Sequence, residues 1–98
     1  MPYRRSYERF ILNDSASLVT QEGIEKTLAL KDLSARGAGI LGDFPLDINQ
    51  RVALAMKSSF ILDEPVAKQA KVVWCKKIDN NLWQAGLDFG LDNKINFI

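Results

Sequence analysis

The 98-residue sequence contains no histidine and a single cysteine, Cys75. Without histidine, the Ser-His and Cys-His nucleophile systems cannot form, and the most common zinc ligand is missing. One cysteine allows neither an intramolecular disulfide nor a thiolate metal cluster. These absences exclude most hydrolytic chemistry, so we expect neither a metal site nor an enzyme.

The sequence also lacks a charge surplus and a long hydrophobic segment. Thirteen Lys and Arg residues face twelve Asp and Glu residues, for a net charge of +1. This balance argues against a general binder of DNA, RNA or an anionic membrane surface. No apolar run approaches the ~20 residues that span a bilayer, and no apolar stretch follows the basic N-terminus as in a signal peptide. We therefore expect a cytoplasmic protein without membrane insertion.

Length and composition indicate one domain over residues 1–98. Hydrophobic residues make up 47% of the chain and charged residues 26%, which is typical of a globular domain. A chain of this size buries roughly 60–70% of its unfolded surface, enough for a core without disulfides. The sequence contains no repeat, low-complexity tract or linker that would mark an internal boundary.

Hydrophobic residues alternate with polar or small residues in several segments, which predicts strands with one buried face. The alternation is clear over residues 27–31 and 51–57. Residues 66–77 and 82–89, joined by an Asp-Asn-Asn turn signal at 79–81, predict a hairpin. Shorter strands fit residues 10–12, 17–20, 38–41 and 60–62. This pattern favours a small antiparallel barrel or sandwich, with one short helix over 91–98.

Residues 37–42 read Gly-Ala-Gly-Ile-Leu-Gly and match the G-x-G-x-x-G pattern of dinucleotide-binding folds. In those folds the glycines end a strand and open a helix that holds the pyrophosphate. Here a proline follows at position 45, with no helical apolar pattern. We interpret the match as coincidence.

The segment from Asp32 to Gly37 directly follows the predicted strand over 27–31. Asp32 and Ser34 are common turn-forming residues, because their side chains bond nearby backbone N–H groups. The same residue types can also bind a nucleotide. A carboxylate accepts two hydrogen bonds from the N1–H and N2–H₂ edge of guanine, a serine hydroxyl bonds phosphate, and a glycine permits close approach. The hexapeptide alone leaves both interpretations open.

Arginines are concentrated at the N-terminus, where Arg5 and Arg9 stand four residues apart. One helical turn or a curled loop would direct both at a single ligand. The guanidinium fork suits phosphate oxygens and the O6/N7 edge of guanine, and it stacks on bases. The alternative is a solvated basic terminus in which Glu8 pairs with Arg4.

Considered together, Arg-x-x-x-Arg at the N-terminus and Asp-x-Ser-x-x-Gly between strands resemble the two motifs of the PilZ domain, a bacterial receptor module for cyclic di-GMP. Residues 72–74 and 85–89 are similar to the paired late strands of that family. The resemblance implies an all-β fold, a six-stranded antiparallel barrel with a short C-terminal helix. It divides the chain into a mobile ligand-binding arm over 1–9, a barrel over 10–90 and a helix or tail over 91–98.

The resemblance also implies a cyclic di-GMP site. Arg5 and Arg9 would clamp phosphate and the guanine Hoogsteen edge, while Asp32 and Ser34 would read guanine and phosphate. The further contacts expected from it are close approach at Gly37, a phosphate contact or stack from Arg36, and a stack on Trp74, for which a core position is the alternative. We expect no other cofactor.

An extra arginine, Arg4, precedes the first motif and suggests a second, intercalated cyclic di-GMP molecule. We expect ligand binding to order the arm and so signal to a downstream protein, whose identity the residues do not give. The apolar end of the chain leaves open a docking helix, a homodimer contact or the stub of a longer protein.

Three other functions compete with this interpretation. A PilZ-like adaptor would act through protein contacts without nucleotide, but it would not need both motifs complete. A barrel that binds single-stranded nucleic acid would need a basic groove, which the near-neutral charge disfavours. An enzyme would need a base near Asp32 and Ser34, and the neighbouring sequence offers none.

Overall fold

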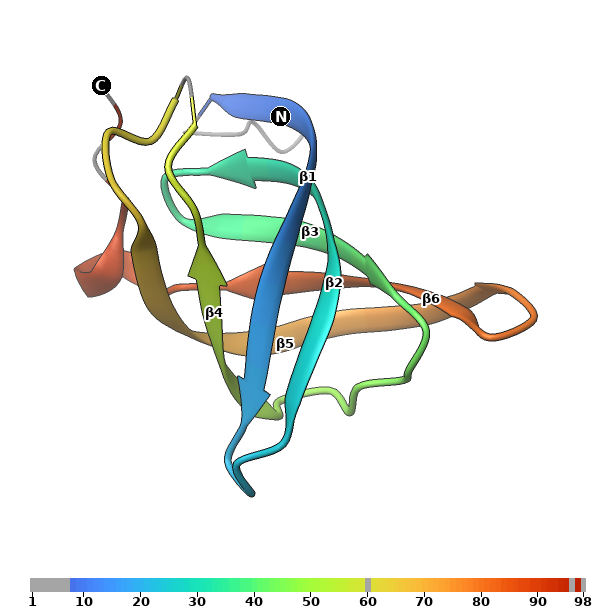
Figure 1. Cartoon of the computed structure of the whole chain (residues 1–98). Helices are drawn as coiled ribbons and strands as arrows, with labels where there is room; N and C mark the ends of the chain where they lie inside the picture. Colours follow the sequence, from blue (N-terminus) through green and yellow to red (C-terminus); the bar gives the residue numbers. More distant parts are fainter. Residues whose placement is uncertain (1–7, 60, 96, 98) are drawn as a thin grey trace, which may run out of the picture.

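A computed structural model describes residues 8–59, 61–95 and 97 of the chain. Six strands form a closed barrel in the order β1-β2-β3-β6-β5-β4, and all neighbouring strands are antiparallel. The predicted six-stranded all-β barrel is therefore confirmed (Figure 1). The strands are β1 (Arg9–Thr20), β2 (Glu25–Ser34), β3 (Gly37–Gly42), β4 (Arg51–Met56), β5 (Val66–Asp79) and β6 (Leu82–Asp88).

The barrel core is formed by the alternating residues that the sequence predicted to be buried. In β4, Val52, Leu54 and Met56 are buried, while Arg51 and Ala55 are exposed. In β2, Leu28 and Leu30 are buried in the same way. The largest side chains with almost no exposed surface are Leu18, Leu33, Leu54, Val52 and Val72. Burial of such a set is the main contribution to the stability of the barrel.

Two predicted details of the early and middle chain differ from the structure. Residues 10–12 and 17–20 belong to one strand, β1, because Asp14 and Ser15 between them continue the pairing with β2 after a register shift. Residues 61 and 62 are buried but form no strand. Two backbone hydrogen bonds join Ser59 and Leu62 (2.9 and 3.3 Å), and residue 60 lies outside the described residues.

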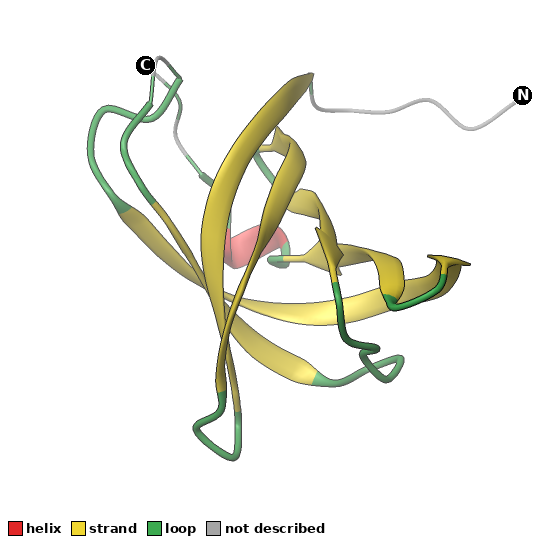
Figure 2. Cartoon of the chain, turned by 45° about the vertical axis from the view of Figure 1, so that its right-hand side comes forward, coloured by secondary structure: helices red, strands yellow, loops and turns green. Residues whose placement is uncertain are grey.

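Among the described residues of the predicted C-terminal helix, one 3₁₀ turn is present, Leu91–Asn93 (Figure 2). The chain then becomes extended at Lys94, and the Ile95 N–H donates to the Ala35 carbonyl at 2.7 Å. The Phe97 ring packs on Phe10 with a centroid separation of 4.9 Å. The apolar tail is therefore held by contacts with the barrel, which a free-standing short helix would lack.

Strand β1 begins at Arg9, the last residue of the predicted ligand-binding arm, whereas residues 1–7 of that arm lie outside the described residues. The β5–β6 hairpin projects beyond the other strands (Figure 1). At its turn Asn81 has a φ of 56°, a left-handed conformation that asparagine tolerates better than most residues. Within the described part of the chain, no helix is long and apolar enough to cross a membrane.

Candidate ligand-binding site

The G-x-G-x-x-G segment at 37–42 is strand β3 from end to end. It pairs with β2 on one side and β6 on the other, and it opens no helix. The interpretation of this match as coincidence is confirmed, because a pyrophosphate site of that type needs a helix N-terminus.

A row of residues crosses four adjacent strands at one level of the barrel. Asp32 of β2 pairs with Gly39 of β3, Gly39 pairs with Gly86 of β6, and Gly86 pairs with Trp74 of β5. Both ends of the row follow a register shift, between Leu30 and Asp32 and between Val72 and Trp74. Bulges of this kind redirect the side chains beside them. Asp32 and Trp74, at the two ends of the row, therefore lie where the sheet is locally irregular.

The two glycines leave room for the side chains at the ends of the row. A Cβ atom built on Gly39 would collide with the Asp32 carboxylate, and one built on Gly86 would collide with the Trp74 indole. Each side chain therefore lies over the backbone of its glycine neighbour. Neither position accommodates a larger residue unless Asp32 or Trp74 moves.

Arg9 joins the row from β1, where it pairs in register with Ser34. Its Nη1 forms an ion pair with Asp32 Oδ1, and the two side chains are 32% and 21% exposed. The buried Arg9 Nε has no hydrogen-bond partner among the described residues. An arginine with an unused donor beside a carboxylate is well suited to rearrange around an incoming acceptor.

A cavity of about 310 Å³ lies over this row. It contains a cationic fork and a carboxylate at one end and a partly exposed aromatic ring, Trp74 at 41%, at the other. This combination suits a planar ligand with a hydrogen-bonding edge and a negative group. The lining residues are Arg9, Asp32, Ala38, Gly39, Val73, Trp74, Gly86 and Leu87.

Three of the predicted site residues lie at the β2–β3 turn and do not line this cavity: Ser34 ends β2, Arg36 lies in the turn, and Gly37 begins β3. Ser34 is buried, and its hydroxyl accepts a hydrogen bond from the Gly37 N–H at 3.2 Å and lies 3.4 Å from the Gly37 carbonyl. A Cβ on Gly37 would collide with the Leu87 carbonyl of β6. These contacts show Ser34 and Gly37 shaping the turn and its packing on the sheet.

Arg36, the third turn residue, is tied to the end of β6. Its Nε donates to Asp88 Oδ1 at 3.2 Å, and its carbonyl accepts from the Phe89 N–H at 2.7 Å. The Gly90 N–H completes the set by donating to the same Asp88 oxygen at 3.0 Å. The turn is thus held by the chain that leaves β6.

The structure therefore brings Arg9, Asp32 and Trp74 together, and it places Ser34, Arg36 and Gly37 outside the cavity. Arg4 and Arg5 lie outside the described residues. Sequence reasoning missed Gly39 and Gly86. The only local signal for Gly39 is the glycine-rich segment at 37–42, which matches the pattern of a different fold.

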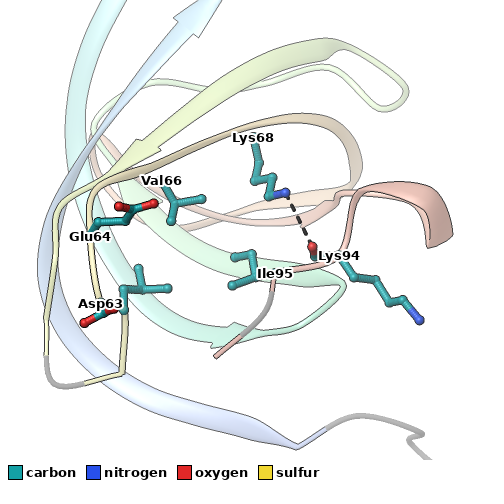
Figure 3. Close-up of a pocket in the computed structure, with 7 residues that line it drawn as sticks. Asp63, Glu64, Val66, Lys68, Lys94 and Ile95 are labelled. Carbon is teal, nitrogen blue, oxygen red and sulfur yellow. Dashed lines mark hydrogen bonds between the residues drawn. The ribbon is translucent and has the colours of Figure 1, made fainter. Parts of the chain in front are cut away.

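A second cavity, also about 310 Å³, lies where the loop before β5 meets the C-terminal segment (Figure 3). The Lys68 ammonium donates there to the Lys94 carbonyl at 3.4 Å and to Asn93 Oδ1 at 3.2 Å. Asp63 and Glu64 bring charge of the opposite sign to the same lining. This mixture of charges selects no particular ligand.

Among the described residues, no group of three or more His, Cys, Asp or Glu side chains could hold a metal ion.

Comparison with known proteins gives one family and one fold. The model of the PilZ domain matches residues 3–96. Among solved structures, the chain is similar to K. pneumonia MrkH in its complex with c-di-GMP, with a TM-score of 0.68 and 18% identity. The similarity covers 92% of this chain but 46% of that one, so this chain spans about half its length. At this identity the likeness concerns the fold. No curated protein matches the chain.

Proposed function

Because the chain belongs to the PilZ domain family, we propose that it is a bacterial cyclic di-GMP receptor acting in the cytoplasm. The observation that carries this proposal is the convergence of Arg9, Asp32 and Trp74 on one cavity. These residues come from three different strands, yet together they offer what a guanine nucleotide requires. Support also comes from the fold shared with MrkH, which was solved with c-di-GMP.

Asp32 and Arg9 would form the polar end of the site. The Asp32 carboxylate would accept hydrogen bonds from the N1–H and N2–H₂ groups of guanine, and the Arg9 fork would bind a phosphate or the O6/N7 edge. Before this can happen, the ion pair between them must open or be shared. We propose that the ligand exchanges this contact for its own, which also brings an acceptor to Arg9 Nε.

Trp74 would form the apolar end. Its indole lies over Gly86 and is 41% exposed, so one part of the ring is supported by the sheet. A guanine base stacking on such a ring gains about 1–3 kcal/mol. The presence of this side chain in the cavity lining favours the stacking role over the core position considered from the sequence.

The remaining motif residues would act around this centre. We propose that Ser34 and Gly37 maintain the backbone conformation of the β2–β3 turn. Arg36 is exposed enough on the surface of this turn to attract a phosphate group. Arg4 and Arg5 would add phosphate and guanine contacts, and Arg4 would support a second, intercalated ligand molecule. Binding through these two arginines would hold the N-terminal segment against the barrel and present a new surface to a downstream protein.

Isothermal titration of cyclic di-GMP into the protein, with GTP and cyclic di-AMP as controls, tests this function. We expect saturable binding that is selective for cyclic di-GMP and lost in Arg9→Ala. Two ligands per chain, reduced to one in Arg4→Ala, would support the intercalated pair, whereas one ligand per wild-type chain would reject it. No binding at high micromolar ligand would contradict the receptor function and favour an adaptor that works without nucleotide.

A further inference from the structure

Strand β5 extends beyond its pairing with β4, and we call the side of β5 that faces β4 its outer side. Its pairing with β4 ends at Lys71, opposite Arg51, and Val72 bonds to the backbone of Asn49 and Gln50. From residue 73 to residue 79 its only strand partner in the described part of the chain is β6. We call residues 73–79 the β5 edge. The backbone groups on its outer side form no sheet ladder, which makes it a template for another strand.

The β5 edge is long and accessible. Its seven residues extend about 23 Å, whereas a whole strand of the usual 5–6 residues extends about 17–20 Å. Val73, Trp74 and Ile78 are 44%, 41% and 45% exposed. The edge also runs along the hairpin that projects from the barrel (Figure 1). An added strand would therefore meet little steric obstruction.

The charges along the edge are mostly positive. Lys76 and Lys77 are both exposed, and the Lys77 ammonium lies 5.5 Å from the centre of the Trp83 ring. Asp79 is the one acidic residue of the segment and stands at its end. Lysines on an edge oppose pairing with a similar strand, because like charges placed opposite each other are destabilising. Antiparallel self-pairing about Lys76 would place two Lys76 side chains face to face. A second copy is therefore disfavoured.

We propose that the β5 edge docks an extended, acidic and aliphatic segment of a partner protein by strand addition. Main-chain hydrogen bonds would provide the general affinity. Lys76 and Lys77 project from opposite faces of the strand, so they would select carboxylates at two adjacent positions of the partner. Val73 and Ile78 would contact the aliphatic side chains of the added strand. This surface lies apart from the β2–β3 turn and the N-terminal arm, but it shares Val73 and Trp74 with the candidate ligand cavity.

The edge begins inside the ligand cavity, because Val73 and Trp74 line that cavity as well. A ligand that stacks on Trp74 would alter the first residues available to the added strand. Nucleotide and partner would then influence each other's affinity by the same factor. This coupling rests on the proposed function, whereas the docking surface itself does not.

Binding of a fluorescein-labelled seven-residue valine peptide with two adjacent glutamates at its centre, measured without nucleotide, tests the surface. We expect saturable binding by fluorescence anisotropy and slower hydrogen exchange at those amides of residues 73–79 that point away from β6. N-methylation of one alternate set of peptide amides should abolish binding, and methylation of the other set should preserve it, because only one set faces the edge. The nucleotide has no part in this experiment, so a failed receptor function leaves its result unaffected.

Two double variants with the same change in net charge distinguish strand addition at the β5 edge from attraction by the net charge of the protein. Lys76→Glu combined with Lys77→Glu should weaken the acidic peptide at least roughly tenfold and favour a valine–lysine peptide. Lys26→Glu combined with Lys57→Glu changes the net charge equally outside β5 and should have little effect. The proposal is overturned by absent binding at millimolar peptide, by equal binding of both methylated forms, or by equal loss in both double variants. It is also overturned if the free protein forms a dimer with protected amides 73–79, since the occupant would then be a second copy.

Discussion

Asp32 and Ser34 stand two residues apart in the same motif, but the structure gives them different surroundings. Asp32 lies on the outside of the barrel, paired with Arg9 and lining a cavity with Trp74. Ser34 is 4% exposed and bonded to Gly37 within the turn. The comparison shows that one short motif combines a residue available to a ligand with a residue that maintains the backbone beneath it.

The glycines of β3 repeat this difference. Gly37 is confined by a backbone atom, the Leu87 carbonyl, which belongs to the sheet itself. Gly39 is confined by a side chain, the Asp32 carboxylate, which belongs to the candidate site. A substitution at the first position must disturb the fold, while a substitution at the second can be relieved by moving a functional side chain.

The largest expected effect is the loss of stability in Gly37→Ala. The added methyl group would force β3 away from β6, and overpacking of this kind costs about 3 kcal/mol of unfolding free energy. Urea denaturation measures the change. Gly23→Ala is a useful control, because Gly23 has a φ of 88° with no atom near its Cβ direction and should cost only about 1–2 kcal/mol. Equal losses in the two variants would contradict the steric explanation.

In contrast to Gly37→Ala, Asp32→Ala should cause a large loss of cyclic di-GMP affinity and a small loss of unfolding free energy. Removal of the carboxylate leaves the guanine edge unpaired, and we expect cyclic di-GMP affinity to fall about 100-fold. The partly exposed ion pair with Arg9 should contribute less than about 1 kcal/mol to folding. Calorimetry and urea denaturation on the same sample give both values. A loss of several kcal/mol in the free protein would make Asp32 structural.

Ser34→Ala should affect stability more than it affects direct ligand contact. The substitution leaves the buried Gly37 N–H without its acceptor, at a cost of about 1–2 kcal/mol. We expect the affinity to change by less than about threefold when measured well below the melting temperature. Ser58→Ala, on an exposed loop after β4, is a matched control. A large drop in affinity with unchanged stability would move Ser34 into the binding surface.

The smallest expected change is that of Arg36→Ala. The Arg36–Asp88 pair is 43% and 30% exposed, and surface pairs of this type contribute about 0.5 kcal/mol. A small drop in melting temperature, absent at high salt, would agree with this. If Arg36 also attracts phosphate, the affinity for cyclic di-GMP should fall with a reduced dependence on salt. An unchanged affinity would limit Arg36 to its contact with Asp88.

Much of the architecture could be predicted from local patterns, and the exceptions have physical causes. The alternation in β4 and the turn signal before β6 are local, so they identified these strands directly. The polar residues at 13–15 interrupt the hydrophobic pattern, so the sequence predicts two strands where one exists. The tail was assigned a helix because its contacts with Ala35 and Phe10, which are distant in sequence, have no local signal.

The sequence by itself determined which residue types are present for chemistry and which faces of the strands turn inward. An arginine, a carboxylate and a tryptophan capable of binding a guanine are visible in it, as is the absence of histidine. Only the tertiary structure decided that Arg9, Asp32 and Trp74 meet over two glycines while Ser34 turns away from them. The reason is strand register, which depends on pairing along the whole barrel. A one-residue shift at a bulge is enough to move a side chain to the other face.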